Sequence, residues 1–147
     1  MNENTQRRIT VYTDGACTGN PGPAGVGIVL SNGKVRRFIS EYLGHATNNI
    51  AELTAIKRAL EVIKSRDLPI DLYTDSSYSI GVLTMGWKAK ANQELIAGIK
   101  IQLLAYPRLK IHKVEGHAGV PGNEKADELA RKAVESQSST SEYENLT

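Results

Sequence analysis

The chain has 147 residues, of which 40% are hydrophobic and 23% charged, and a formal net charge of +2. The length and composition are those of one ordinary globular domain with a sizeable core, and the charge is too small to indicate a nucleic-acid partner by itself. Apolar runs of only a few residues argue against a membrane span, and the single cysteine, Cys17, excludes an internal disulfide or a zinc site of its own.

Hydrophobic periodicity divides residues 9–135 into strands and helices. The polar segment 1–8, which lacks the apolar stretch of a secretory signal, is predicted to be a flexible arm. Strands are expected at 9–14, 26–30, 34–42, 70–75 and about 108–114. Helices are expected from a cap at Asn48 or Asn49 to Ile63, and at 76–85, 93–105 and 123–135. The Ser-rich tail, 136–147, is predicted to be disordered.

The order of these elements predicts a single three-layer α/β domain with a mixed sheet. Its first three strands form an antiparallel meander, and a crossover helix returns the fourth strand parallel to the first. Val11-Tyr12-Thr13-Asp14 and Leu72-Tyr73-Thr74-Asp75 are near copies that end these two parallel strands. Asp14 and Asp75 are therefore expected at the same sheet edge, where open α/β sheets bind their ligands.

Two further acids are predicted to face the sheet from helices. Glu52 shares a helix face with Ile56, and Asp127 forms a row with Ala130 and Val134. Carboxylates on core-facing rows are costly, and four at one edge raise one another's pKa unless a divalent cation binds there. Oxygen ligands without a His or Cys cluster favour Mg²⁺ or Mn²⁺, and two such ions suit phosphodiester hydrolysis.

Each acid also has a local explanation. Asp14 before Gly15 suits a turn, Asp75 suits a helix N-cap, and Glu52 and Asp127 complement helix dipoles. These local explanations account for any one acid better than for the convergence of all four, so the metal-site hypothesis is preferred.

Five motifs occur in order along the chain: Thr13-Asp14-Gly15-Ala16, Asn20-Pro21-Gly22, Thr47-Asn48-Asn49 with Ala51-Glu52-Leu53, Thr74-Asp75-Ser76, and Gly116-His117-Ala118-Gly119 with Asn123-Glu124-Lys125-Ala126-Asp127-Glu128-Leu129-Ala130. This set resembles type 1 ribonuclease H over residues 9–135. The resemblance implies the ribonuclease H-like fold, a five-stranded mixed sheet of order 3-2-1-4-5 with helices on both faces. It also implies an endonuclease that hydrolyses the RNA strand of RNA–DNA hybrids with two metal ions, leaving 3′-hydroxyl and 5′-phosphate ends. The family's metal-site acids fall on Asp14, Glu52, Asp75 and Asp127.

The same resemblance assigns residues to proton transfer and to the substrate. His117, which lies between glycines, is expected to assist the attacking water or the departing product, and an ordinary histidine pKa of about 6.5 suits that role. Contacts to RNA 2′-hydroxyls are implied for the backbone from Gly15 to Cys17 and for Asn20, Asn49 and Glu52. Thr47 and Asn92 resemble the family's pocket for a DNA phosphate. His45 and His112 have no partner motif and are predicted to be structural.

Two departures from the family pattern stand out. Ser77 occupies a position where many relatives carry Gln, so a base or sugar contact there is expected to be weaker. The chain also lacks the lysine-rich extra helix, the basic protrusion, that many relatives have. In its place, 85–113 contains one acid and a predicted phosphate-facing patch of Lys88, Lys90, Lys100, Arg108, Lys110 and Lys113. Trp87 is predicted to pack on a deoxyribose; the alternative is a solvated helix face with a core Trp.

Two other functions remain open from the residues alone. A DNA nuclease of the same fold, such as an integrase or a junction resolvase, is disfavoured by Thr47-Asn48-Asn49 and His117. A non-catalytic hybrid-binding protein is disfavoured by the four intact acids. We therefore expect a monomeric cytoplasmic enzyme, with the RNA–DNA hybrid as its partner and with no membrane or protein partner.

Overall fold

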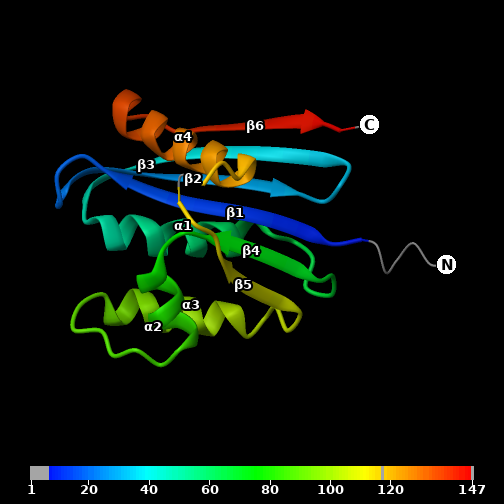
Figure 1. Ribbon diagram of the computed structural model, residues 1–147, viewed down its shortest axis with the longest axis horizontal. Helices are drawn as coiled ribbons and strands as arrows, with labels where there is room; N and C mark the ends of the chain where they lie inside the picture. The colour runs from blue at the N-terminus through cyan, green and yellow to red at the C-terminus, as the bar shows by residue number, and fades with distance from the viewer. Residues whose placement is uncertain (1–6, 117, 147) are drawn as a thin grey trace.

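The computed structural model describes residues 7–116 and 118–146, and Figure 1 shows their arrangement. The strands are β1 (Ile9–Cys17), β2 (Gly22–Ser31), β3 (Val35–Ala46), β4 (Ile70–Thr74), β5 (Leu109–Lys113) and β6 (Thr140–Asn145). The helices are α1 (Asn48–Val62), α2 (Ser77–Thr84), α3 (Gln93–Leu103) and α4 (Pro121–Ser136). No helix in these two ranges is long and apolar enough to cross a membrane.

The strands form one mixed sheet of order β5-β4-β1-β2-β3-β6. β1, β2 and β3 run antiparallel to one another, whereas β4 runs parallel to β1 and β5 parallel to β4. The expected order of the first five strands is confirmed. A sixth strand, β6, adds to the free edge of β3 in the antiparallel sense.

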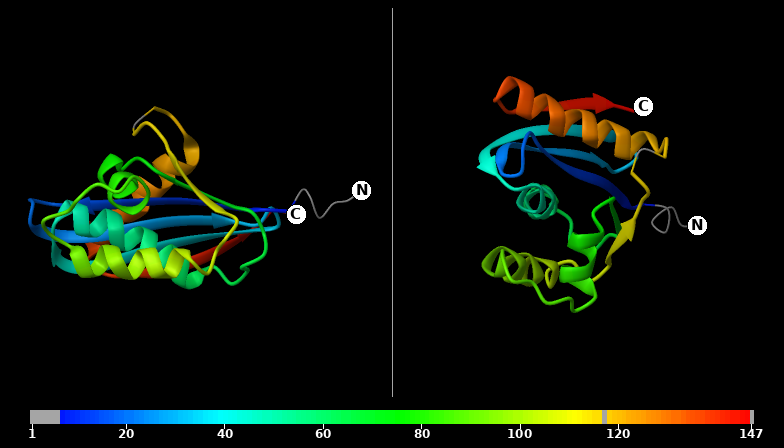
Figure 2. Two further views of the ribbon diagram at one scale, coloured as in Figure 1. Left: turned by 90° about the horizontal axis from the view of Figure 1, so that it is seen from below. Right: turned by 60° about the vertical axis from the view of Figure 1, so that its left-hand side comes forward.

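Helices cover both faces of the sheet, as the alternation of side chains along β2 shows. Val26 and Ile28 are fully buried in the main core with residues of α1. Gly25 and Gly27 face the other way, toward α4. A Cβ on Gly27 would lie 1.9 Å from the carbonyl oxygen of Ala126, so glycine is needed for this close approach. Figure 2 shows α4 on the side of the sheet away from α1 and α3, which makes three layers.

The first helix begins slightly earlier than the sequence predicts. The Thr47 hydroxyl accepts a hydrogen bond from the backbone N–H of Ile50, at 3.1 Å, so Thr47 is the N-cap rather than Asn48 or Asn49. A threonine hydroxyl and an asparagine amide satisfy the free N–H groups of a helix start in the same way, so composition alone does not choose between adjacent candidates.

The prediction of a disordered tail is wrong. α4 continues to Ser136, Gln137 ends it with φ 51°, and β6 then pairs with β3 from Ser40↔Thr140 to Val35↔Asn145. Arg36 binds Glu144 at 2.9 Å and the Arg37 Nε donates to the Ser141 hydroxyl at 2.9 Å. The side chains of β6 are mostly exposed, so its order comes from backbone pairing with an edge strand, which leaves no apolar pattern in the sequence.

The predicted N-terminal arm is anchored at its last residue. The Arg8 guanidinium forms an ion pair with Asp71, next to the start of β4. Residues 1–6 lie outside the described part of the chain.

Removing β6 is therefore expected to destabilise the protein. Truncation after Gln137 exposes the edge of β3 and removes the partners of Arg36, Arg37 and Tyr42. We expect Tm to fall by several degrees, since each kcal/mol lost lowers Tm by roughly 2–8 °C in domains near this size. Thermal unfolding followed by circular dichroism measures the change. The control, Glu142→Gln in exposed β6, should stay within about 3 °C of wild type, and a truncated protein with the wild-type Tm would contradict this account.

Candidate active site

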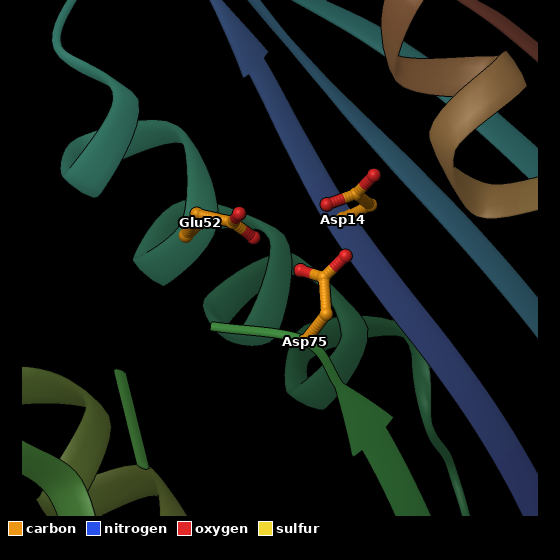
Figure 3. Close-up of side chains that lie close together, drawn as sticks. All are labelled: Asp14, Glu52 and Asp75. Carbon is orange, nitrogen blue, oxygen red and sulfur yellow. The ribbon is translucent and has the colours of Figure 1, made fainter. Parts of the chain in front are cut away.

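Parallel pairing of β1 with β4 brings two aspartates together. Tyr12 of β1 is in register with Tyr73 of β4, and each aspartate follows two residues later in its own strand or just beyond it. Because side chains alternate along a strand, Asp14 and Asp75 leave the same face as these tyrosines. The near copies in the sequence are thus neighbours in the sheet, and they deliver their carboxylates to one place (Figure 3).

Glu52 reaches the two aspartates from α1, because this helix lies very close to β1. A Cβ on Gly15 would lie 2.5 Å from the backbone nitrogen of Glu52 and 2.5 Å from the carbonyl carbon of Ala51, so only glycine permits this approach. The backbone N–H of Gly15 donates to Glu52 Oε1 at 3.1 Å. Gly15 therefore allows α1 to approach β1 and also orients the Glu52 carboxylate.

Asp14, Glu52 and Asp75 form a compact cluster, called here the acidic cluster. One carboxylate oxygen from each lies within 4.8 Å of the others. Asp14 is 4% exposed and Glu52 is 8% exposed, so water screens their charges poorly. The ligand atoms are all oxygens, which suits Mg²⁺ or Mn²⁺ and not a structural zinc.

The electrostatics of the acidic cluster also favour a cation. Burial, followed by the charges of Glu52 and Asp75, raises the pKa of Asp14 to about 9. Burial and the charge of Asp75 raise the pKa of Glu52 to about 8, against the lowering effect of the Gly15 N–H bond and of the bond to Asp14. Without a counter-charge these groups hold protons at neutral pH, and a divalent cation removes the reason to do so.

Asp127 lies next to the acidic cluster but is not part of it. It approaches Asp14 closely enough to raise the pKa of Asp14 through a hydrogen bond and through its charge. Its own Oδ2 accepts a 3.0 Å hydrogen bond from Arg131 Nε, one helical turn further along α4. The predicted meeting of four acids is therefore a group of three with Asp127 beside it. Sequence reasoning missed Arg131, although the i, i+4 spacing from Asp127 was the available signal.

The residues predicted to contact 2′-hydroxyls lie on β1, in the β1–β2 turn and at the start of α1. Gly15 and Cys17 line a pocket of about 350 Å³ that Asp127 and Arg131 close on the other side. The Asn20 side-chain oxygen accepts from the backbone N–H of Asn48 at 2.9 Å, which ties the turn to α1. This bond joins two segments that the sequence analysis assigned to the substrate.

The remaining predicted substrate residues lie on α1, α2 and the α2–α3 connection. Asn49 and Ser77 are exposed in the first turns of their helices. Asn92 has φ 66° and its side-chain amide donates to the Tyr78 hydroxyl at 3.3 Å. Figure 1 shows α1 and α3 beginning at the same end of the molecule, which puts the Thr47 cap and Asn92 at that end.

Trp87 is half exposed and is not a core residue. Its side chain is 49% exposed, and one edge of the indole lies over Gly81, where a Cβ would come within 2.1 Å of the ring. The alternative of a core Trp is therefore wrong, and an aromatic surface remains open to a ligand.

His117 lies outside the described residues. The loop that carries it passes the acidic cluster at its preceding residue: a Cβ on Gly116 would lie 2.9 Å from Asp75 Oδ2. A side chain at this position would have to displace the Asp75 carboxylate, so glycine leaves that carboxylate undisturbed.

The raised pKa of Asp14 predicts how stability depends on pH in the absence of divalent cations. The pKa of Asp14 is about 9 in the folded protein, whereas its usual value is 3.8. The free energy of unfolding is therefore greatest below pH 3.8 and decreases as the pH rises toward 9. Asp14→Asn should flatten this decline and raise Tm by several degrees at about pH 8. Thermal unfolding in EDTA measures it, with exposed Glu128→Gln as the control. Equal pH slopes for wild type and Asp14→Asn would contradict the electrostatic account.

Comparisons with known proteins agree with this geometry. The model of the RNase H family matches residues 6–135. A ribonuclease H of Chlorobium phaeovibrioides is 41% identical over 142 residues, which cover 88% of this chain and 97% of the relative. The crystal structure of RNase H1 from the halophilic archaeon Halobacterium salinarum has a TM-score of 0.75 at 32% identity and covers 88% of this chain and 98% of its own. That of LC11-RNase H1 in complex with an RNA/DNA hybrid has a TM-score of 0.75 at 31% identity and the same coverage.

The family model covers most of the chain. Its match begins before β1 and ends one residue before the end of α4. Together with 41% identity to a ribonuclease H over 88% of the chain, this match shows that the chain belongs to the ribonuclease H family and is a ribonuclease.

Proposed function

We propose that this ribonuclease hydrolyses the RNA strand of RNA–DNA hybrids and leaves 3′-hydroxyl and 5′-phosphate ends. The observation that carries the proposal is the acidic cluster, which joins Asp14 of β1 and Glu52 of α1 to Asp75 at the carboxyl end of β4, the edge where open α/β sheets bind ligands. The relative LC11-RNase H1, whose structure contains an RNA/DNA hybrid, supports the choice of substrate.

Asp14, Glu52 and Asp75 would hold Mg²⁺ in this proposal, with Asp127 completing the site for two ions from the side of α4. Two ions there, Mg²⁺ or in its place Mn²⁺, would supply activation of a water and stabilisation of the leaving oxygen. The Gly15 N–H keeps Glu52 oriented through its 3.1 Å hydrogen bond. Arg131 holds Asp127 through their 3.0 Å hydrogen bond, so Asp127 would become a ligand once the Arg131 side chain moves away.

Recognition of a hybrid requires 2′-hydroxyls on one strand and their absence on the other. In this proposal the RNA strand contacts the 15–17 backbone, the Cys17 side chain, Asn20 and Asn49 beside the acidic cluster. The DNA strand contacts the second set of residues: Thr47, Ser77, Trp87 and Asn92. The RNA set lies on β1, the β1–β2 turn and the start of α1. The DNA set lies on α2 and its connection to α3, with Thr47 at the N-cap of α1 next to the RNA set. We propose that the enzyme acts as a monomer in the cytoplasm.

The direct test is incubation of the protein with a hybrid whose RNA strand is end-labelled. Cleavage of RNA with Mg²⁺, none with EDTA, and none of duplex DNA under the same conditions is the expected result. Cleavage of duplex DNA in preference to the hybrid would instead support the integrase- or resolvase-like alternative. Tight hybrid binding without turnover in Mg²⁺ or Mn²⁺ would support the non-catalytic alternative.

Asp14→Asn should lower kcat by orders of magnitude, because an amide replaces a charged ligand at the centre of the acidic cluster. Steady-state kinetics at saturating Mg²⁺ measure the loss, and a thermal melt verifies the fold. Glu128→Gln, an exposed acid of α4 that pairs with Lys125, is the matched control and should keep the wild-type rate. If Asp14→Asn kept more than about a tenth of wild-type kcat, a loss of under about 1.4 kcal/mol, the metal-site role of Asp14 would be wrong.

His117→Ala tests the proposed proton transfer. A residue that moves a proton contributes about 10²–10⁴-fold, so kcat should fall within that range while Mg²⁺ affinity, measured by calorimetry, stays unchanged. A large loss of Mg²⁺ affinity would show that His117 acts on the metal site instead.

A further inference from the structure

The cations predicted to form one patch over 85–113 divide between the two faces of the sheet. Lys88 and Lys90 lie between α2 and α3, and Lys100 lies on α3, whose Ile96 and Ile99 are buried in the core beneath the sheet. Lys110 instead pairs in register with Asp71, whose neighbours along β4, Ile70 and Leu72, are buried in that same core. By alternation, Lys110 and Asp71 belong to the opposite face.

On that opposite face a group of cations surrounds Asp71, called here the basic cluster and made of Arg8, Arg108, Lys110 and His112. Together with Pro69 and Asp71 these residues line a pocket of about 380 Å³. They come from the segment before β1, from β5 and from the residue just before it, about 100 residues later in the chain, so only the fold assembles them. Figure 1 shows the start of β1 beside β4 and β5 at this end of the sheet.

The basic cluster carries more positive charge than its one carboxylate neutralises. Asp71 accepts from Arg8 and lies 2.8 Å from His112 Nε2. The Arg108 guanidinium donates to the backbone carbonyl of Asp67 at 2.9 Å, which fixes its position without neutralising it. Within 7–116 and 118–146, no ion pair joins Arg108 or Lys110 to an acid. A pocket with two uncompensated cations, one of them held in place, suits an anion.

The basic cluster and the acidic cluster share one strand and one face. Asp71, Tyr73 and Asp75 alternate outward along β4 and the residue after it, so four residues, roughly 13 Å, separate the two clusters. Between them lies a row of stacked rings, Tyr12 on Tyr73 and Tyr73 on His112, each with centroids 4.9 Å apart. The rings cover one another's faces, so they offer edges and hydroxyls rather than a stacking surface for a base.

We propose that the basic cluster binds a backbone phosphate of the hybrid a few nucleotides from the bond that is cut. The inference rests on the proposed function, and it adds a second anchoring point on the face of the sheet away from Lys88, Lys90 and Lys100. The spacing fits, because roughly 13 Å corresponds to a few nucleotides of one strand, which rises about 3.4 Å per nucleotide along the duplex axis while winding around it. A row of half-buried rings that cover one another's faces, with cations at its end, favours a continuous phosphate backbone over a free nucleotide, whose base would need an open ring face.

Arg108→Ala with Lys110→Ala tests the proposal. Binding of a 20-base-pair hybrid is measured by fluorescence anisotropy in EDTA over a range of salt concentrations, so that no cleavage occurs. Arg108 and Lys110 share one phosphate contact, and each lost phosphate contact lowers the steepness of log K against log salt by about 0.7–0.9, so the double variant should lose about that amount. With Mg²⁺, KM should rise while kcat stays close to wild type, since distant contacts bind the ground and transition states alike.

Two control variants separate this site from general charge and from misfolding. Lys64→Ala with Arg66→Ala removes the same charge from the connection between α1 and β4, and should leave the slope unchanged. Arg108→Lys with Lys110→Arg keeps the charges and should restore the wild-type slope. Equal slopes for the Arg108/Lys110 alanine variant and wild type, or an equal loss in the Lys64/Arg66 variant, would overturn the proposal.

The spacing has its own test. A neutral methylphosphonate placed singly at each position two to six nucleotides from the cut should weaken wild-type binding at one of these positions, and should have no effect there on the alanine variant. A uniform penalty at all positions in both proteins would overturn the proposal. Failure of wild type to cleave the hybrid contradicts the proposed function instead, and the binding measurements in EDTA do not depend on that result.

Discussion

Repulsion among buried carboxylates is the interaction on which the rest of this structure depends. Asp14, Glu52 and Asp75 lie within 4.8 Å of one another through their oxygens, and the burial of Asp14 and Glu52 keeps solvent from screening their charges. Such a group persists only because rigid elements force it together: the parallel register of β1 and β4, and the close approach of α1 at Gly15. The repulsion appears as pKa values raised to about 9 for Asp14 and about 8 for Glu52. A divalent cation relieves this repulsion, so the repulsion strengthens the binding of the cation.

Sequence reasoning located those parts of the site that follow from local repetition. The near copies ending in Asp14 and Asp75 predicted their meeting, because parallel neighbours share an edge, and helical spacing predicted that Glu52 faces inward. Sequence reasoning could not predict the position of Asp127 relative to the other acids, because helical spacing gives the face on which a residue lies but not the position of the helix along the sheet. It missed β6, whose order depends on backbone pairing with the edge of β3 and leaves no apolar pattern.

The basic cluster also could not be predicted from local sequence patterns. Arg8 and Asp71 are 63 residues apart and His112 is 41 residues from Asp71, so their association follows from strand order and from no local pattern. The patch predicted over 85–113 combined residues that lie on opposite faces of the sheet. This separation of the metal site from the cations has a physical reason. The metal site needs a buried, water-poor position, whereas cations that only bind the phosphates of the substrate can lie on exposed faces on either side of the sheet.

The carboxyl group of Asp14, observed by carbon-13 NMR through a pH titration with and without Mg²⁺, tests the central claim most directly. In EDTA its ionisation should occur several pH units above the usual value of 3.8, toward about 9. With saturating Mg²⁺ the carboxyl should be ionised throughout the neutral range, because the cation replaces the proton. An ordinary aspartate titration in EDTA, or a titration that Mg²⁺ leaves unchanged, would contradict the account of a repulsive cluster made to hold a metal ion.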